Sequence, residues 1–297
     1  MTTVVAGANG LVGSRIVARL AEAGERVLAV GRGARRFDAD AGYVEIDLLR
    51  EPEKLARLIE SARPEGVIDA AAMTDVDGCE RSPQEAWALN VRAVEVAAQA
   101  CAKAGARLTA LSTDYVFDGV KGSYREDEAP NPRGVYARTK RAGEEAALIL
   151  ADDVSVCRVA VVYSGRPGAK KTFAATALAS LRAGEPVKAF TDQIVSPTLA
   201  DNAAEMVIGV HRSRAQGVFH CAGATEISRL DFCRLLARKL RADDSLIVPV
   251  QMADLKLLAP RPLRCGLRVD KVRRLLGESV PLPVDAALDR FIAETGT

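Results

Sequence analysis

Short apolar runs alternate with longer amphipathic stretches through the first half of the chain. The apolar runs predict strands at Thr3–Ala6, Arg26–Val30, Tyr43–Ile46, Gly66–Ala70, Arg107–Leu111 and Ser155–Val162. The stretches between them predict helices near residues 11–23, 51–62, 83–104 and 136–151. Because parallel strands need long crossover connections, this alternation indicates βαβ units. We therefore expect an α/β fold with a doubly wound parallel sheet.

The pattern becomes irregular after Val162, where eight prolines divide the chain into shorter pieces. Such a segment is typical of a smaller α/β lobe that binds a substrate. No repeat or low-complexity linker separates the halves, so we expect the two lobes to exchange segments. Residues 1–163 and 193–222 are predicted to form a nucleotide-binding domain, and residues 164–192 and 223–297 the substrate-binding lobe.

Composition and charge exclude several classes of function. The 41 Lys and Arg residues and 39 Asp and Glu residues leave a net charge of +2, which predicts neither a nucleic-acid surface nor attraction to a membrane. No apolar stretch reaches the ~20 residues of a membrane helix, and the N-terminus lacks the pattern of a signal peptide. We expect a cytoplasmic protein. Its six cysteines include no CxxC pair and predict reduced, buried thiols and no metal site.

Three glycines recur at every third position between the first predicted strand and the first predicted helix. Glycine lets the backbone approach a pyrophosphate, whose charge is stabilised by free N–H groups and by the helix dipole. We therefore expect a Rossmann-type fold that binds a dinucleotide here. The residues expected to contact it are Gly7, Asn9, Gly10, Leu11, Val12 and Gly13.

The end of the second predicted strand distinguishes the nicotinamide cofactors. An acidic residue there would bind the adenosine ribose of NAD, but the chain has Arg32, followed by Arg35 and Arg36. Guanidinium groups suit a 2′-phosphate, so we expect NADP(H), with Arg32 as a contact. A solvated basic loop is the alternative interpretation. Asp47 and Leu48 follow the third strand and are expected to lie near the adenine.

Tyr136 and Lys140 are four residues apart and share one face of a predicted helix. A nearby ammonium group favours the phenolate and lowers the pKa of a tyrosine, which can then exchange a proton while the cofactor exchanges a hydride. Thr113 follows the fifth strand, where its hydroxyl can bind a substrate carbonyl. An idle surface pair and a polar loop with a turn at Asp118–Gly119 are the alternatives.

These motifs together resemble the extended short-chain dehydrogenases/reductases, and more specifically the dTDP-4-dehydrorhamnose reductase family. The resemblance rests on the glycine loop, the segment Ser112–Gly119 and the Tyr136/Lys140 pair. Further matches lie at residues 70–77, 90, 124–132, 162–164, 192–198 and 261–262, so it covers essentially the whole chain. It implies that Thr113, Tyr136 and Lys140 catalyse NADPH-dependent reduction of a 4-keto group on a nucleotide-linked deoxysugar.

The resemblance also implies further binding residues. Those for the cofactor are Ala70, Ala71, Ala72, Tyr136 and Lys140. Those for the nucleotide-sugar substrate are Thr74, Val76, Asp77, Thr113, Asp114, Tyr115, Tyr163, Thr198 and Arg261, of which Arg261 is expected to meet the diphosphate. Some family members bind Mg²⁺ at a dimer contact, but no ligand cluster here predicts a metal, and a homodimer stays open.

Three positions depart from the family pattern. Val161 stands where tryptophan is often found, Thr172 replaces an asparagine, and Arg264–Cys265 replaces Asn-Ser. They leave the base and the sugar undetermined. A dehydratase or epimerase of the same fold is one alternative, disfavoured because Tyr115 occupies the position of the dehydratase glutamate. A non-catalytic subunit like the regulatory beta subunit of methionine adenosyltransferase is the other, disfavoured by the complete catalytic trio.

Overall fold

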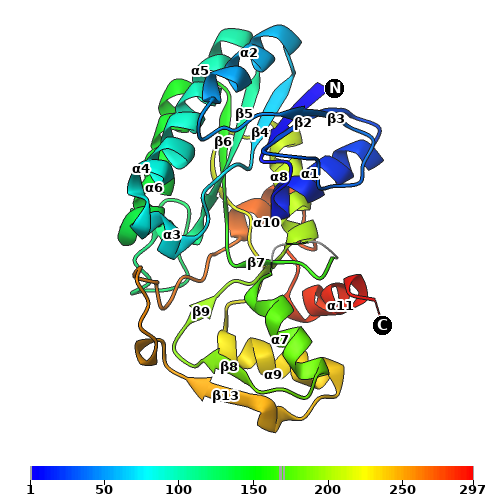
Figure 1. Cartoon of the computed structure of the whole chain (residues 1–297), viewed down its shortest axis with the longest axis vertical. Helices are drawn as coiled ribbons and strands as arrows, with labels where there is room; N and C mark the ends of the chain where they lie inside the picture. Colours follow the sequence, from blue (N-terminus) through cyan, green and yellow to red (C-terminus); the bar gives the residue numbers. More distant parts are fainter. Residues whose placement is uncertain (1, 167–168, 170, 297) are drawn as a thin grey trace.

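A seven-stranded parallel sheet forms the centre of the larger lobe in the computed structural model, which describes residues 2–166, 169 and 171–296 (Figure 1). The strand order is β11-β6-β5-β4-β1-β2-β3, and each neighbouring pair is parallel. The order reverses between β1 and β4, where such sheets bind ligands at the carboxyl ends of their strands. The predicted Rossmann-type doubly wound sheet is confirmed.

The elements of this lobe lie close to the predicted ranges. The strands are β1 Thr2–Ala6, β2 Arg26–Gly31, β3 Gly42–Glu45, β4 Gly66–Asp69, β5 Arg107–Thr113, β6 Val154–Val159 and β11 Gly217–His220. The helices are α1 Leu11–Glu22, α2 Pro52–Ala62, α3 Val76–Arg81, α4 Pro83–Trp87, the π-helical turn η1 Ala88–Arg92, α5 Ala93–Ala104, the 3₁₀ turn η2 Asp114–Val116, α6 Gly134–Leu150, α8 Ala200–Ser213 and α10 Asp270–Leu276.

Different helices cover the two faces of the sheet, because its strands are apolar on both sides. Helices α1 and α8 pack on one face, and α2, α5 and α6 on the other (Figure 1). Ile16 and Val17 of α1 and Val207 of α8 are fully buried, as is Ile59 of α2. Each such side chain stabilises the fold by about 1.5–3 kcal/mol, so the apolar face of each helix turns to the sheet. In the described part of the chain, no helix is long and apolar enough to cross a membrane.

The predicted strand Ser155–Val162 is wrong as a single element. Strand β6 ends at Val159, and Val162 begins a separate strand, β7 Val162–Tyr163, which pairs with β10 Thr198–Leu199. Between them Val161 has a φ of +42°, a left-handed conformation that a β-branched residue rarely adopts. This turn directs the chain out of the large sheet and into the smaller lobe.

Short strand pairs and helices make up the smaller lobe (Figure 1). Its elements are β8 Val187–Phe190 with β13 Ile247–Val250, β9 Ile194–Val195 with β12 Ile227–Ser228, α7 Phe173–Arg182, α9 Arg229–Leu240, α11 Val284–Glu294 and the 3₁₀ turns η3 Asp244–Leu246 and η4 Met252–Asp254. The predicted assignment of all of residues 223–297 to this lobe is wrong. Cys265, Leu267 and Val272 pack in the core of the larger lobe, because α10 returns to contact α8 and β11.

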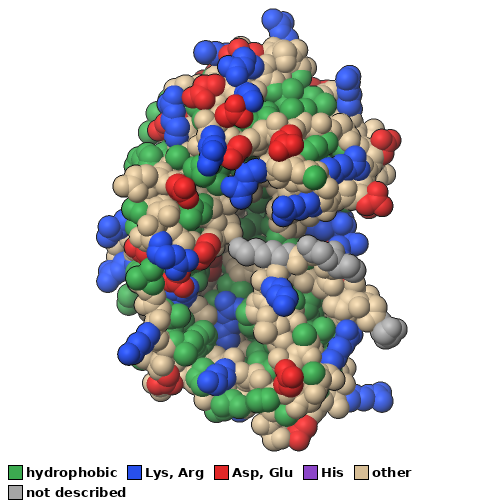
Figure 2. Space-filling model, in the orientation of Figure 1, with side chains coloured by type: hydrophobic (Ala, Val, Ile, Leu, Met, Phe, Trp, Pro, Cys, Tyr) green, Lys and Arg blue, Asp and Glu red, His purple; other side chains and the backbone are tan. Residues whose placement is uncertain are grey.

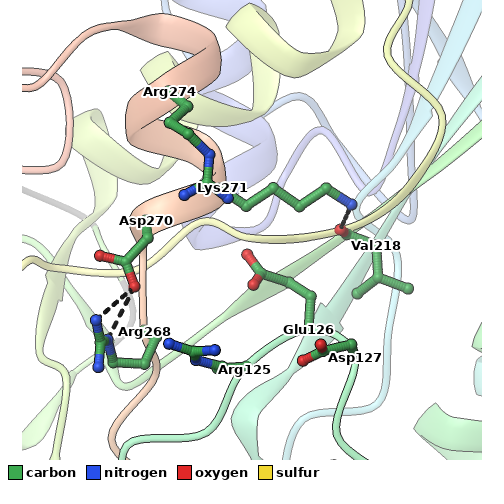
Figure 3. A pocket seen from close by; sticks show the side chains of 8 residues that line it. All are labelled: Arg125, Glu126, Asp127, Val218, Arg268, Asp270, Lys271 and Arg274. Carbon is green, nitrogen blue, oxygen red and sulfur yellow. Dashed lines mark hydrogen bonds and ion pairs between the residues drawn. The ribbon is translucent and has the colours of Figure 1, made fainter.

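A cavity of about 570 Å³ lies at the outer edge of β11, with charged side chains around it (Figure 3). Lys271 Nζ donates to the carbonyl of Val218 at 2.6 Å, and Glu126 Oε1 accepts from the amide of His220 at 3.1 Å. These contacts occupy backbone groups that an edge strand would otherwise offer to another chain. The described residues that line the cavity include none of the predicted site residues, so we assign these two charges to protection of the sheet edge.

Candidate active site

The glycine loop passes so close to neighbouring backbone that two of its positions exclude any side chain. Gly7 has a φ of +74°, and a Cβ there would lie 2.6 Å from the carbonyl carbon of Ala70. A Cβ on Gly13 would lie 2.2 Å from the carbonyl oxygen of Gly7. Gly10 precedes α1 without a side-chain cap, and no acidic residue occupies the first turn. The N–H groups at this end of α1 are therefore open to an anion, which fits the pyrophosphate of a dinucleotide.

The side chain of Asn9 holds the arginine loop against the glycine loop. Its Nδ2 donates to the carbonyls of Arg32 and Ala34 at 3.1 and 3.0 Å, and its Oδ1 accepts from the amide of Arg36 at 2.9 Å. The Tyr43 hydroxyl lies 2.9 Å from the same Nδ2. Both amide hydrogens thus have protein acceptors, so the Asn9 side chain holds the two loops together, and the predicted contact of Asn9 with a cofactor stays a prediction.

The three arginines after β2 differ in how their guanidinium groups are used. Arg35 donates to the carbonyls of Phe37 and Ala41 at 2.9 and 3.3 Å and lies over the Phe37 ring. Arg32 and Arg36 are exposed, and their guanidinium groups have no partner among the described residues. Arg32 and Arg36 are therefore the arginines available to a 2′-phosphate.

The other predicted cofactor residues follow β3 and β4 at the same edge of the sheet. Asp47 accepts from the amide of Leu49 at 3.0 Å, and the side chain of Leu48 is buried in the core. Ala70 and Ala71 lie directly behind Gly7, and Ala72 follows them. The structure thus brings these segments together with the glycine loop, and their contacts with a cofactor stay predictions.

The predicted catalytic trio meets at the carboxyl end of β5. Thr113 is the last residue of that strand, and its hydroxyl donates to Asp114 Oδ1 at 3.0 Å, accepts from the amide of Tyr115 at 3.2 Å and hydrogen-bonds with Tyr136. Lys140, one turn further along α6, donates from Nζ to the carbonyl of Leu111 at 2.8 Å. Strand β5 and helix α6 therefore bring the phenol and the hydroxyl together, and they place the ammonium on the same strand, at the residue two before Thr113.

The pKa of Tyr136 is raised in the structure, whereas the sequence predicted that Lys140 would lower it. Burial raises the pKa of Tyr136, and the hydrogen bond with Thr113 partly offsets that effect. Lys140 was expected to lower this pKa, but burial also lowers the pKa of Lys140 itself, and its ammonium faces the carboxylates of Asp69 and Glu144. Tyr136 is therefore protonated at neutral pH, which is the form that donates a proton to a ketone.

Glu144 is a positioning residue that the sequence analysis missed. It lies four residues after Lys140, so Tyr136, Lys140 and Glu144 share one face of α6. Arg158 of β6 binds it through Nε–Oε1 and Nη2–Oε2 contacts of 2.8 Å each, and both side chains are buried. Breaking one partner of such a pair costs about 3–5 kcal/mol, so it fixes α6 on the sheet. The four-residue spacing was the signal that could have revealed it.

Asn90, in the π-helical turn η1, holds the loop after β4 against α6. Its Oδ1 accepts from the amide of Met73 at 2.8 Å, and its Nδ2 lies 3.1 Å from Thr139 Oγ1. Such π-turns are rare and occur frequently at functional sites. Asn90 thereby aligns the segment that carries the predicted substrate residues Thr74 and Val76, of which Thr74 is exposed and Val76 half-buried.

Asp77 and Arg261, both predicted to contact substrate, bind each other. The Nη1–Oδ1 and Nη2–Oδ2 distances are 2.9 and 2.8 Å. The hydrogen bonds from Arg261 and from the amide of Ala259 lower the pKa of Asp77 to about 2. The Arg261 guanidinium is thus already neutralised, and its predicted contact with a diphosphate would compete with Asp77.

Tyr163 and Thr198 are corrected from substrate contacts to core residues, because neither has any exposed surface. The Tyr163 ring packs against Phe232 and Phe291 with centroids 5.5 and 5.1 Å away. The Thr198 hydroxyl donates to the carbonyl of Ser196 and accepts from the amide of Gly223, both at 3.0 Å. Side chains enclosed in this way stabilise the smaller lobe.

Asp114 and Tyr115 directly follow Thr113, one of the three predicted catalytic residues. Burial raises the pKa of Asp114 to about 7, and its Oδ2 has no hydrogen-bond partner among the described residues. The Tyr115 ring meets that of Tyr136 edge-on at 5.7 Å. Figure 2 shows the molecule hollowed between its two lobes, with basic side chains along the hollow. The edge-on rings of Tyr115 and Tyr136 form an aromatic surface next to Thr113.

The doubly wound sheet, the glycine loop and the Thr113, Tyr136 and Lys140 arrangement together define an extended short-chain dehydrogenase/reductase. The profile of the family described as "RmlD substrate binding domain" matches residues 1–296, and the chain belongs to that family.

Named relatives extend over most of the chain. A "Probable low-salt glycan biosynthesis reductase Agl14" of Haloferax volcanii is 35% identical over 300 residues, which cover 99% of both chains. A "dTDP-4-dehydrorhamnose reductase" of Mycobacterium tuberculosis is 36% identical over 265 residues, covering 87% of this chain and 82% of the other. A solved structure of a hypothetical dTDP-4-dehydrorhamnose reductase from Sulfolobus tokodaii superposes with a TM-score of 0.85 at 30% identity, covering 96% of this chain and 98% of that one.

Proposed function

We propose that this protein is an NADPH-dependent oxidoreductase that reduces the 4-keto group of a nucleotide-linked deoxysugar. The observation that carries the proposal is the meeting of Thr113, Tyr136 and Lys140 at the carboxyl end of β5. The names of the relatives supply the substrate class, a dTDP-linked sugar with a keto group.

The residues that would hold the cofactor follow from the fold. The glycine loop and the uncapped end of α1 suit the pyrophosphate, and Arg32 and Arg36 suit a 2′-phosphate. Lys140 keeps ammonium hydrogens beyond its bond to Leu111 and is suited to the nicotinamide ribose. When bound, NADPH would supply the hydride.

The chain itself would orient the ketone and supply the proton. The Thr113 hydroxyl would donate to the carbonyl oxygen, which both orients the ketone and stabilises the developing alkoxide. Tyr136 would transfer its phenolic proton to that oxygen, and Lys140 would stabilise the resulting phenolate. Because the Thr113 proton otherwise lies toward Asp114, a protonated Asp114 frees the hydroxyl to bind substrate.

The test is a panel of dTDP-, UDP-, GDP- and CDP-linked 4-ketosugars, scored by the loss of NADPH absorbance. We expect net oxidation of NADPH with at least one of them and formation of the corresponding alcohol. Tyr136→Phe is the matched control, because it removes only the hydroxyl. Conversion of a sugar nucleotide without net NADPH oxidation would instead identify a dehydratase or epimerase, and no conversion of any would favour the regulatory-subunit alternative.

The proposal includes a cytoplasmic location. All six cysteines are free and buried in the structure, which agrees with a reducing compartment. Whether two copies associate is a separate question, which the mass in solution answers directly.

A further inference from the structure

Arg229 is held rigidly at the start of α9 in the smaller lobe. Its Nε donates to Gln193 Oε1 at 3.0 Å, and its backbone amide donates to the Gln193 carbonyl at 3.1 Å. Its guanidinium carbon lies 3.7 Å from the centre of the Phe173 ring. Gln193 is itself buried, so the plane of the guanidinium is fixed before any ligand arrives.

One side of this guanidinium is left without a partner. Its Nη1 is buried and has no hydrogen bond, and no ion pair joins Arg229 to a carboxylate within the described part of the chain. Burial lowers the pKa of Arg229 to about 10. A buried cation without a counter-charge is unfavourable, which is the usual condition of a residue that awaits an anionic ligand.

The groups that Arg229 faces place it at the catalytic cleft. Tyr115 and Asp114, which follow the catalytic Thr113, are the groups whose charges act most strongly on it. The charges of two cations, Arg229 and Arg261, act on Tyr115, and Arg261 is neutralised by Asp77. Asp114 is only partly ionised near neutral pH because burial raises its pKa to about 7. Of the two cations beside Tyr115, only Arg229 therefore has charge to offer a ligand.

We propose that Arg229 is a substrate-binding residue whose free guanidinium nitrogen binds an oxyanion of the nucleotide sugar. The inference rests on the proposed function, in that it takes the cleft beside Tyr136 as the nucleotide-sugar site. The diphosphate is an oxyanion that every such substrate carries, and a carboxylate on the sugar offers the same chemistry. Arg229 stacks on Phe173, which is the neighbour of Thr172, one of the positions that depart from the family pattern.

The test compares nucleotide binding by the intact protein and by Arg229→Met, measured by calorimetry with NADPH present. Methionine retains an unbranched side chain over Phe173 but removes the charge. We expect the Kd for dTDP to rise roughly ten- to a hundred-fold, as the loss of a charged hydrogen bond implies, with the Kd for NADPH unchanged. Arg234→Met is the matched control, because Arg234 lies on the same helix with its side chain 47% exposed, and it should bind dTDP as the wild type does.

A second arm distinguishes the two sources of the oxyanion. If Arg229→Met weakens dTDP and UDP-glucose alike, Arg229 binds the diphosphate. If it weakens only UDP-glucuronic acid, Arg229 binds the sugar carboxylate, and the inference also holds. Wild-type affinity of Arg229→Met for all three, or failure of the wild type to bind any of them, would overturn it.

Arg229→Lys tests whether the loss of dTDP affinity comes from the charge or from a change in the structure of the lobe. Lysine keeps the charge but cannot reproduce the planar contact with Gln193 and Phe173. We expect it to bind dTDP more tightly than Arg229→Met and less tightly than the wild type. A lysine variant that melts early yet binds dTDP normally would show that Arg229 only supports the lobe. Since these readouts need no turnover, a protein that reduces no ketosugar but loses dTDP affinity on Arg229→Met would reject the proposed reaction and retain this inference.

Discussion

Arg261 and Asp77, which are 184 residues apart in the chain, form an ion pair with two parallel hydrogen bonds of 2.9 and 2.8 Å. The amide of Ala259 donates to the same carboxylate at 2.9 Å. Asp77 therefore holds the segment that contains Ala259 and Arg261 against the start of α3. Asp77 and Arg261, both expected to bind substrate, thus join two segments that are distant in the sequence.

The first prediction concerns the stability that this pair provides. Arg261→Ala and Asp77→Ala should each lower the free energy of unfolding by about 1–2 kcal/mol, because the pair is partly exposed. The double variant should be little worse than either single one, as shared contacts require. Because the folded-state pKa of Asp77 is about 2, below its value of about 4 in an unfolded chain, the stabilisation should be present above pH 4 and lost as the pH falls toward 2.

Urea unfolding of the four proteins at neutral and acidic pH measures these effects. Fully additive losses would show that the two residues act independently. The substrate KM of Arg261→Ala tests the remaining hypothesis, that Arg261 binds the diphosphate. A sharp rise in KM with a smaller change in kcat would mean that Arg261 leaves Asp77 to bind the diphosphate.

The second prediction is that reduction requires the proton of Tyr136. Tyr136→Phe preserves the ring that packs on Tyr115 but deletes the transferable proton, so kcat should fall by about 10²- to 10⁴-fold while NADPH still binds. Thr113→Val should also lose activity, whereas Thr113→Ser should retain most of it. Lys140→Met should weaken NADPH binding as well as catalysis. Stopped-flow reduction and NADPH titration provide the two readouts, and wild-type turnover by Tyr136→Phe would remove the main support for this mechanism.

The third prediction is that Arg32 selects the cofactor. Its exposed guanidinium has no partner in the described residues, so Arg32→Ala should weaken NADPH by roughly ten- to a hundred-fold and leave the NADH affinity nearly unchanged. Arg36→Ala should act in the same direction. Fluorescence titration with both cofactors measures the ratio, and equal losses for NADPH and NADH would contradict the assignment.

The fourth prediction concerns the pH dependence that Asp114 introduces. Its folded-state pKa of about 7 lies above the value of about 4 expected when unfolded, so its contribution to stability is full below pH 4 and is lost as the pH rises through 7. Asp114→Asn keeps the shape and removes the ionisation. The variant should therefore gain stability relative to the wild type between pH 5 and pH 8, on the order of a few kcal/mol. Thermal melts across that range provide the measurement, and a difference that does not change with pH would show that Asp114 is not the titrating group.

The sequence was enough to predict the sheet, the glycine loop and the places of Thr113, Tyr136 and Lys140 in the fold, whereas their catalytic roles stay predictions. These features are local. Strands and helices follow from the spacing of apolar residues, and Tyr136 and Lys140 share a helix face because they are four residues apart. The end of each strand also has a fixed place in a parallel sheet, so the position of Thr113 at the carboxyl edge followed from the order of elements.

Which polar side chains are free can be seen only in the folded chain. Nothing in the sequence shows that Asp77 neutralises Arg261, that Tyr163 and Thr198 are fully enclosed, or that the Asn9 amide is already bonded to the loop after β2. Each of these contacts joins segments distant in the chain, and it forms only where the fold brings them within hydrogen-bond distance. The same reason separates Arg261 from Arg229: both are arginines at the border of the cleft, but only the packed structure gives one a carboxylate and leaves the other without one.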